Sequence, residues 1–482
     1  MLFHTLKFFC FFLIVYHIYI RFNHRWQNRL LLFSSYYFYG SWDWRFLSLI
    51  VISTLVDYFC GLRIYNTDKK AEKRKYLFLS LVTNFGLLGY FKYFNFFAAN
   101  FYQLFSSFGV AVNPLYLKII LPVGISFYTF QTLSYTIDIY NGKIKPEKNV
   151  FDFALFVAFF PQLVAGPIER AKSLIPQVKA VRKIDFTMIK EGLWLFCYGF
   201  FLKVFIADSM VRIVDQVFNA SAPVSSGIVS LMGIYAFAFQ IFGDFAGYSS
   251  MAIGISKLLG FDLMTNFLYP YLVTNPSDFW KNWHISLSTW LKDYLYVPLG
   301  GNRLGKWLTY RNLMITMLLG GLWHGAAWTF VLWGFYQGII LVVHRFVKQE
   351  ISFPKVPMKF ERVWFAVKVV VMFHVTCLGW LIFRAQSLGQ IGYMLGNIFN
   401  RFSVDMSLGI TFGLQILQYT WLFWIIHLIQ YKNDNNFAIL NLSQRFKYPI
   451  CIGMLCSVMF IIVTTVLSHG KFGDQPFIYF QF

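Results

Sequence analysis

The chain has 482 residues, of which 57% are hydrophobic and only 13% are charged. About a quarter of the residues in a soluble protein are charged, so this composition excludes an ordinary soluble protein and predicts an all-α polytopic membrane protein. The net charge of +21 would point to nucleic acid in a soluble protein. Here the basic residues form short clusters between apolar runs, as in 63–75, which is typical of cytoplasmic loops and of contact with anionic lipid. We therefore expect membrane lipid, and no nucleic acid, as a partner.

The first apolar run covers residues 1–20 and has the length of a signal peptide. Lys7 lies inside the apolar stretch and no small-residue cleavage site follows it, so we expect this run to remain as the first membrane helix. Further apolar runs recur as far as 449–467 and predict about ten to thirteen transmembrane helices, with the shorter runs re-entrant or interfacial. Because no linker divides them, we expect a single membrane domain over 1–482.

The segment 277–345 differs from the runs around it. Aromatic and leucine side chains recur at helical spacing from Trp283 to Leu295, and the opposite face carries Lys281 and Lys292. The spacing predicts an amphipathic helix, rich in tryptophan, that lies at a membrane surface or lines a cavity. The alternative is a simple interfacial anchor.

Two histidines in this segment are the candidates for chemistry. His284 lies on the predicted amphipathic helix, and His324 lies in an apolar run beside Gly320, Gly321 and Gly325. An ionisable side chain at membrane depth is costly and marks a candidate functional site. Desolvation keeps such an imidazole neutral, so a ring nitrogen can accept a proton from a hydroxyl group. The glycines leave space in which another backbone or a substrate could approach. The alternative for His324 is a packing histidine bonded to a neighbouring carbonyl.

Other polar residues in apolar runs are interpreted as structural. We expect His374 and His427 to be packing histidines, because neither has glycine spacing around it. Asp138 and Asp244 are expected to bond within the helix bundle, although either could orient a histidine. The six cysteines form no CxxC pair and no zinc-ligand spacing with histidine, so we expect neither a disulfide framework nor a metal site.

The orientation of the last helices follows from basic residues. The stretch 344–362 holds five Lys or Arg and two Glu, and 431–448 is also basic, so both are expected in the cytoplasm. The apolar runs between them cross the membrane twice, and 449–467 then leads out. By this parity the aromatic tail, residues 468–482, is extracytoplasmic.

Five motifs together resemble the membrane-bound O-acyltransferase (MBOAT) family. The similarity is closest to the bacterial branch that acylates cell-surface polymers, to which alginate O-acetylation belongs. The motifs follow the family's order over about residues 30 to 345. They are LPVGISFYTFQTLSYTIDIYNG (121–142), FFPQLVAGPIER (159–170), FQIFGDFAGYSSMAIG (239–254), DFWKNWHISLSTWLKDYLYVPLGGNR (278–303) and GGLWHGAAWTFVLWG (320–334).

The resemblance implies a fold and an activity. The fold would be a ring of tilted helices around a tunnel, with the acyl donor entering from the cytoplasm and the acceptor hydroxyl from outside. His324 matches the family's catalytic histidine and His284 matches its second tunnel histidine, whereas His374 matches no motif. Acetyl-CoA as the acyl donor is implied by the family alone, since no coenzyme-binding motif is visible in the chain.

The tail, PFIYFQF at 476–482, resembles a C-terminal motif of this branch. There the tyrosine is thought to accept the acyl group in the tunnel and to pass it to an extracellular partner; the matching residue is Tyr479. A phenol has a pKa of about 10, so a phenyl ester has a good leaving group. A covalent intermediate on the tyrosine would divide the transfer into two steps. The alternative is an aromatic anchor at the membrane interface.

These observations predict an O-acyltransferase of the bacterial inner membrane that moves acetyl groups toward a surface polysaccharide or peptidoglycan. His324 would deprotonate Tyr479, and His284 would bind the donor or relay a proton. A separate extracytoplasmic acyltransferase resembling a serine hydrolase would complete the reaction on the polymer. The alternatives are D-alanyl transfer to a teichoic acid-type polymer, a lipid or protein O-acyltransferase of the same fold, and a transporter or flippase. The absence of an internal repeat in the sequence weakens the last of these.

Overall fold

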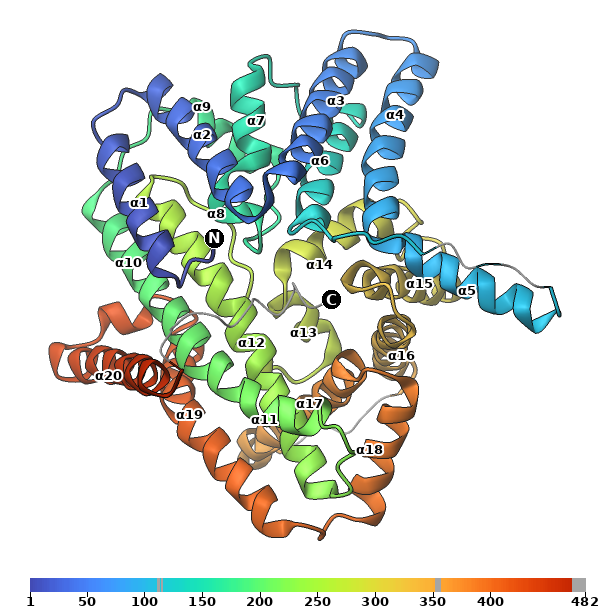
Figure 1. The fold of residues 1–482 in the computed structure, drawn as a ribbon, viewed down its shortest axis with the longest axis vertical. Coiled ribbons are helices and arrows are strands. Elements are labelled where there is room, and N and C mark those ends of the chain that lie inside the picture. Colours follow the sequence, from blue (N-terminus) through green and yellow to red (C-terminus); the bar gives the residue numbers. More distant parts are fainter. Residues whose placement is uncertain (111–112, 114–115, 352–356, 470–482) are drawn as a thin grey trace. The chain divides into compact units, whose positions relative to one another are not determined.

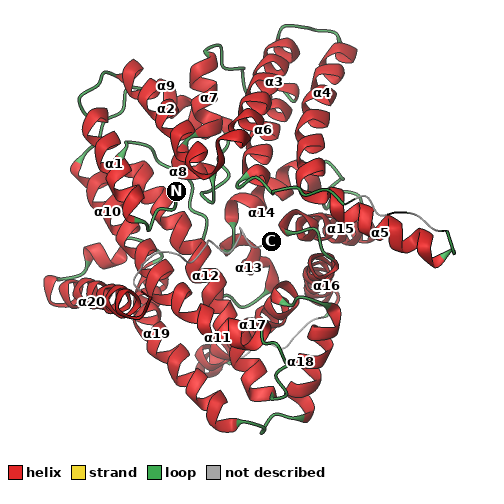
Figure 2. Cartoon of the chain, in the orientation of Figure 1, coloured by secondary structure: helices red, strands yellow, loops and turns green. Residues whose placement is uncertain are grey.

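In a computed structural model, the structure describes residues 1–110, 113, 116–351 and 357–469. Helices and connecting loops make up these residues, and no strand occurs among them (Figure 2). The prediction of an all-α protein is therefore confirmed. Most of the predicted tail, including Tyr479, lies outside the described residues.

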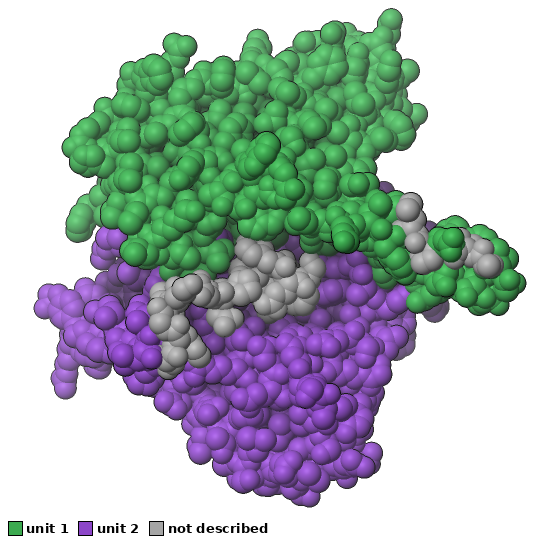
Figure 3. All heavy atoms as spheres, viewed as in Figure 1, with its two compact units in different colours: residues 1–189, 255–264 green, residues 190–254, 265–482 purple. Residues whose placement is uncertain are grey.

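The chain divides into two compact units, coloured green and purple in Figure 3. The first unit comprises residues 1–189 and 255–264. Its helices, labelled in Figure 1, are α1 (Leu6–Tyr19), α2 (His24–Asp43), α3 (Leu47–Tyr65), α4 (Lys70–Leu88), α5 (Phe94–Ser107), α6 (Ile125–Tyr140), α7 (Val150–Ala158), α8 (Phe160–Leu163) and α9 (Ala171–Lys179).

A buried polar network holds three helices of the first unit together. The carboxylate of Asp57, on α3, accepts hydrogen bonds from Asn84 of α4 at 2.8 Å, from Thr136 of α6 at 3.2 Å and from Ser80 of α4. A buried carboxylate is tolerated when hydrogen bonds replace its lost hydration. The polar residues of these apolar helices therefore pair with one another and fix how the helices pack.

The second unit comprises residues 190–254 and 265–482 and contains both candidate histidines. Its helices are α10 (Phe186–Phe201, from residue 190 onward), α11 (Asp208–Phe218), α12 (Gly227–Leu258, as far as residue 254), α13 (Pro276–Asn282), α14 (Ile285–Leu291), α15 (Lys306–His324), α16 (Trp328–Glu350), α17 (Glu361–Arg384), α18 (Leu388–Asn400), α19 (Met406–Asn433) and α20 (Gln444–His469). Short 3₁₀ or π-helical turns adjoin several helices of both units: Trp44–Phe46, Gly89–Tyr93, Leu202–Ala207, Pro270–Leu272, Lys292–Tyr296, Met358–Phe360 and Ala438–Asn441.

Eight helical stretches of the described chain are long and apolar enough to cross a membrane. They are His24–Tyr65, Lys70–Ser107, Phe186–Phe218, Gly227–Leu258, Trp328–Glu350, Met358–Arg384, Met406–Asn433 and Gln444–Leu467. This is fewer than the ten to thirteen spans expected. Part of the difference has a geometric reason, since His24–Tyr65 contains 42 residues and would measure about 63 Å as one helix. That length is about twice the hydrocarbon core of a bilayer, and α2 and α3 within it are each long enough for one crossing.

The predicted first membrane helix is shorter than a full span. Helix α1 is apolar and runs for 14 residues, which corresponds to about 21 Å of helix. It begins where the Thr5 side chain accepts the backbone N–H of Phe8.

The two acidic residues interpreted as structural form ion pairs. Asp138 pairs with Lys143 at 3.3 Å in the first unit. In the second unit Lys203 lies 2.7 Å from Asp244, on α12, and 2.8 Å from Asp208, at the start of α11. The prediction that Asp244 bonds within the helix bundle is confirmed, whereas the Asp138 pair joins the end of α6 to the exposed Lys143 in the loop that follows it.

Helices α15 and α16 pack backbone against backbone (Figure 1). A Cβ atom added at Gly321 would lie 2.3 Å from the carbonyl oxygen of Phe330, and one added at Gly334 would lie 2.4 Å from that of Met317. The space beside these glycines is therefore filled by the neighbouring helix. Of the two uses considered for such space, the approach of another backbone is the one that the structure shows at Gly321.

Candidate active site

His284 lies at a break between two helices. The sequence predicted one amphipathic helix through this region, but α13 ends at Asn282 and α14 begins at Ile285, with His284 between them in the left-handed conformation (φ 44°, ψ 55°). The expectation of a continuous helix was wrong. A side chain other than glycine in this conformation costs about 1–2 kcal/mol, and such strain is concentrated at functional sites.

A single asparagine secures the chain just after His284. The backbone carbonyl of Asn266 accepts the N–H of Ile285 at 2.9 Å, and its side-chain oxygen accepts both the N–H and the hydroxyl of Ser286, at 3.2 and 3.0 Å. The Asn266 amide also donates to the hydroxyl of Ser249, on α12, at 3.0 Å. The strained residue is thus fixed to a long helix through four hydrogen bonds. Sequence reasoning missed Asn266, whose only signal is an amide within an aromatic and apolar stretch.

His324 is the last residue of α15 and is 4% exposed. The chain leaves the helix through Gly325 in an extended conformation (φ −162°), and α16 begins at Trp328. The imidazole meets the ring of Trp333, on α16, at a centroid distance of 5.0 Å and that of Phe383, on α17, at 5.3 Å. The helix end therefore carries the imidazole into an aromatic enclosure.

The two predicted histidines lie around one indole ring. The centroid of the Trp323 ring is 5.8 Å from that of His284 and 5.0 Å from that of His324. The segment with His284 is not among the candidate membrane spans. Burial lowers the pKa of His284 well below the usual histidine range, and the nearby His324 lowers this pKa further. His284 is therefore neutral at physiological pH and can accept or donate one hydrogen bond at each ring nitrogen.

Aromatic side chains surround this pair of histidines. Phe245, on α12, packs edge-on against His284 at a centroid distance of 4.6 Å. The neighbouring Trp283 lies 4.7 Å from Trp380, on α17, and 5.0 Å from Phe267. Such surroundings lower the local dielectric and strengthen hydrogen bonds to a reacting group. The arrangement can support proton transfer within a dry, apolar site.

The remaining histidines of the second unit differ from one another. His374 donates one ring N–H to the Val370 carbonyl at 2.8 Å, and its other ring nitrogen bonds the Tyr235 hydroxyl at 2.7 Å. Its side chain is exposed, and these contacts give it a structural role that joins α17 to α12. His427 is 3% exposed, and neither ring nitrogen has a hydrogen-bond partner among the described residues. Packing alone does not explain His427, which sequence reasoning treated in the same way as His374.

Among the described residues, no group of three or more His, Cys, Asp or Glu side chains is arranged to hold a metal ion. The six cysteines, all of them in that part of the chain, are free thiols. The position of Tyr479 relative to the histidines lies outside the described residues.

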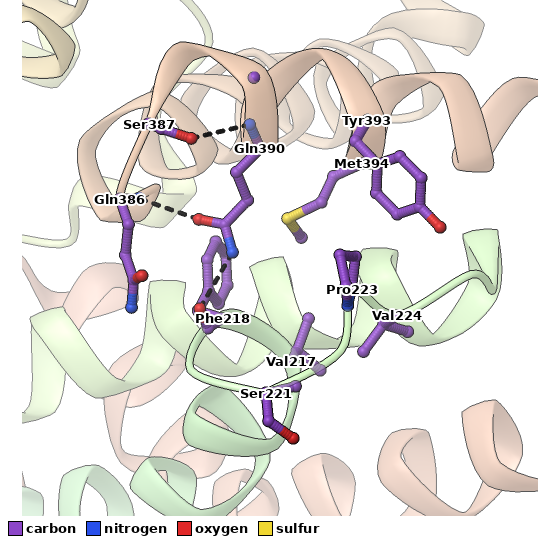
Figure 4. Close-up of a pocket in the computed structure, with 12 residues that line it drawn as sticks. Val217, Phe218, Ser221, Pro223, Val224, Gln386, Ser387, Gln390, Tyr393 and Met394 are labelled. Carbon is purple, nitrogen blue, oxygen red and sulfur yellow. Dashed lines mark hydrogen bonds between the residues drawn. The ribbon is translucent and has the colours of Figure 1, made fainter.

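A pocket of about 390 Å³ lies elsewhere in the second unit, between the loop after α11 and the start of α18 (Figure 4). Figure 4 shows the Gln390 amide at one side of it, where it accepts the backbone N–H of Gln386 at 2.8 Å and donates to the carbonyl of Phe218 at 2.9 Å. None of the predicted site residues lines this pocket. It is therefore not the histidine site.

Comparison with known proteins gives a consistent result. The family model of the membrane-bound O-acyltransferases matches residues 31–383, a range that includes His284 and His324. The chain is 43% identical over 380 residues to the probable alginate O-acetylase AlgI of Azotobacter vinelandii, covering 78% of this chain and 73% of that protein. It is 38% identical over 389 residues to the peptidoglycan O-acetyltransferase of Helicobacter pylori, covering 74% and 71%. It is 28% identical over 281 residues to the teichoic acid D-alanyltransferase of Bacillus subtilis, covering 55% and 69%.

Proposed function

This chain belongs to the membrane-bound O-acyltransferase family, and from that premise we propose that it moves an acetyl group from acetyl-CoA in the cytoplasm toward a polysaccharide or peptidoglycan at the cell surface. It is a multi-pass membrane enzyme of the O-acyltransferase class. The membrane would be the bacterial inner membrane, with the C-terminus outside. The observation that carries the proposal is the burial of His284 and His324 around the Trp323 ring.

The chemistry follows from these buried imidazoles. His324 takes the proton of the Tyr479 hydroxyl, and the phenolate oxygen attacks the carbonyl carbon of the acetyl thioester. The carbon–sulfur bond breaks, an aryl ester forms on Tyr479, and coenzyme A leaves as a thiolate that receives a proton. His284 binds the thioester carbonyl through a ring N–H or relays this proton.

The second half of the transfer takes place outside the cytoplasm. A separate enzyme resembling a serine hydrolase takes the acetyl group from Tyr479 and places it on the polymer. Three features support this scheme: the aromatic tail around Tyr479, its expected extracytoplasmic position after 449–467, and the leaving-group quality of a phenol. The O-acetyltransferase names of the relatives at 43% and 38% identity support acetyl as the acyl group.

The proposal is tested by mass spectrometry of the C-terminal peptide from purified protein incubated with acetyl-CoA. We expect the wild-type tail to gain one acetyl group and the Tyr479→Phe and His324→Ala variants to gain none. His374→Leu is the matched control, because it removes a histidine outside the site, and it should retain acetylation. Two results together would show that the tail carries no acyl group. The wild-type tail would be unmodified in cells whose polymer is acetylated, and Tyr479→Phe cells would retain full polymer acetylation.

D-Alanyl transfer is the second candidate, favoured by the relative at 28% identity. In that case the donor is a D-alanyl thioester on a carrier protein. The same peptide measurement with this donor distinguishes the two, because the mass gained by the tail identifies the acyl group. Transport or flipping of a lipid-linked sugar is excluded if acylation depends on His324.

A further inference from the structure

Two buried polar side chains face each other next to the histidine pair. The imidazole of His427, on α19, lies 5.5 Å from the Tyr269 ring between centroids. Neither nitrogen of His427 nor the hydroxyl of Tyr269 has a hydrogen-bond partner among the described residues, and the two residues are only 3% and 6% exposed. A buried polar group left without a partner destabilises the folded protein, so two at one place call for an explanation.

The backbone at this place is also strained. Tyr269 adopts the left-handed conformation (φ 47°, ψ 45°), which is unfavourable for any residue with a Cβ atom. Pro270 follows it, and a residue before proline normally prefers an extended backbone. The fold thus stabilises an unfavourable conformation that brings the Tyr269 ring to His427. Strain of this kind is found at binding and catalytic sites.

Contacts along α12 connect this pair to the candidate active site. The Phe242 ring lies 5.7 Å from His427 and 6.3 Å from Trp283, the residue before His284. Phe245, one helical turn further along α12, contacts His284. His427 and His284 therefore adjoin successive turns of one helix. Beyond His427, α19 ends at the basic stretch 431–448, where we expect the cytoplasm.

We propose that Tyr269 and His427 bind an amide group of the acyl donor's pantetheine arm and so hold the thioester at the histidine pair. The inference rests on the proposed function. The pantetheine arm is uncharged and carries amide groups, which match an aromatic surface with one hydroxyl donor and one imidazole. The same arm occurs in coenzyme A and on carrier proteins, so both kinds of donor have the required chemistry.

The chemistry of each partner fits this role. Burial and the nearby Asp434 raise the pKa of Tyr269 to about 12, so the phenol stays protonated and donates to an amide carbonyl. A ring nitrogen of His427 accepts the amide N–H. His427 lies outside the range matched by the family model, which ends at residue 383. Tyr269 lies within that range, in the connection that precedes α13. They bind the donor and take no part in the proton transfer.

The test compares the buried His427, which lacks hydrogen-bond partners among the described residues, with the exposed His374, which has two. We expect His427→Leu to raise the KM for acetyl-CoA about tenfold with little change in kcat. Its melting temperature should stay level or rise, because leucine removes polar atoms that lack partners. His374→Leu should instead lower the melting temperature by several degrees, since the Tyr235 hydroxyl loses its partner, and should leave KM unchanged. Tyr269→Phe should raise KM in the same way as His427→Leu.

Direct binding of coenzyme A and of free pantetheine separates this inference from the proposed function. Both ligands should bind the wild type about tenfold more tightly than His427→Leu, whether or not acetyl transfer occurs. Tighter binding only of an acyl-carrier protein would keep the site and identify the carrier as the source. Equal affinities of the wild type and the variant for coenzyme A, pantetheine and the acyl-carrier protein alike, or an unchanged KM with a lower melting temperature, would overturn the inference. Failure of the wild type to acylate from either donor, with the affinity difference intact, would overturn the proposed function alone.

Discussion

The side-chain oxygen of Asn266 accepts both the backbone N–H and the hydroxyl of Ser286, at 3.2 and 3.0 Å. This relationship fixes the first turn of α14 and, with it, the left-handed backbone of His284. In this set of hydrogen bonds, Asn266 alone connects Ser286 to Ser249 of α12. We therefore expect Asn266 to act through His284 as a positioning residue.

Asn266→Ala should lower the rate of tail acetylation by roughly ten- to a hundredfold, because a histidine out of position loses much of its general-base or binding effect. The measurement is kcat for acetylation of the C-terminal peptide. In a His284→Ala background the same substitution should have little further effect, since its role depends on that imidazole.

The matched control is Asn397→Ala. Asn397 is also buried in the second unit and donates to the Val224 carbonyl at 2.9 Å, so its loss reports the general cost of removing a buried asparagine. Equal losses of activity in the two variants, or additive losses with His284→Ala, would mean that Asn266 supports the fold and not His284.

A second prediction concerns the buried ion-pair cluster. Lys203 lies between Asp208 and Asp244, and its side chain is 2% exposed. Lys203→Met removes the cation that lies between these two carboxylates and should lower the free energy of unfolding by roughly 3–5 kcal/mol. Thermal melts of the detergent-purified protein would measure the change. Lys281→Met breaks an exposed pair with Asp278 and should cost less than about 1 kcal/mol.

Replacing all three charged residues shows whether unpaired charge or lost packing causes this loss of stability. If unpaired charge is the cause, the triple variant Lys203→Met, Asp208→Asn, Asp244→Leu should recover much of the stability, because apolar residues can replace a buried ion pair. A triple variant as unstable as Lys203→Met would show that packing, and not charge, is lost.

The two histidines of the candidate site could be predicted from the sequence, because ionisable residues in apolar runs stand out. His284 and His324 were both identified in this way, and Asp244 was identified as a structural residue. The break at His284 could not be predicted, since the aromatic residues from Trp283 onward keep helical spacing through it. The break depends on hydrogen bonds from Asn266, about twenty residues earlier in the chain, and such a contact leaves no periodic signal.

The difference between His374 and His427 was equally inaccessible. Both lie in apolar runs, but a hydroxyl from α12 and a backbone carbonyl reach His374, whereas His427 meets aromatic rings. Whether a buried or exposed histidine finds hydrogen-bond partners depends on its neighbours in the tertiary structure, which the composition of an apolar run does not reveal. The number of spans is hard to predict for a related reason, because apolar runs can form short helices such as α7 and α8 as well as full crossings.

A third prediction is a pH dependence of stability. Glu169 is 1% exposed and accepts the N–H of Met264 at 2.6 Å. Burial raises its pKa to about 7, whereas the unfolded chain has a value of about 4.3. The folded state therefore holds this proton more tightly than the unfolded state. The contribution of Glu169 to stability should be greatest below about pH 4 and fall as the pH rises to about 7, by roughly 3 kcal/mol.

Glu169→Gln should remove most of this dependence, because the amide stays neutral and can still accept the N–H of Met264. Melting temperatures at pH 5 and pH 8 would measure it. We expect the variant to be more stable than the wild type at pH 8 and similar at pH 5. A variant that is less stable at both values would indicate that the ionised carboxylate is the favoured form in the folded protein.

The last prediction tests whether the close packing of α15 and α16 positions His324. At Gly321 a Cβ atom would lie 2.3 Å from the carbonyl oxygen of Phe330, which is backbone and cannot yield without moving α16. At Gly320 the nearest atom is the end of the Leu291 side chain at 3.2 Å, which can shift. Overpacking a helix contact costs about 1–3 kcal/mol or more. Gly321→Ala should therefore lower the melting temperature and separate His324 from Trp333, reducing tail acetylation at least tenfold.

Gly320→Ala is the matched control and should stay within about twofold of the wild-type rate, since a flexible side chain absorbs a contact of this size. The two variants add the same methyl group at adjacent positions of one helix, so helix propensity changes equally in both. Any difference in melting temperature or rate between the two variants must come from the atoms that the added methyl group contacts. Similar losses in both variants would contradict the assignment of the α15–α16 contact as the element that holds His324, and the aromatic rings around the imidazole would then be the remaining candidates.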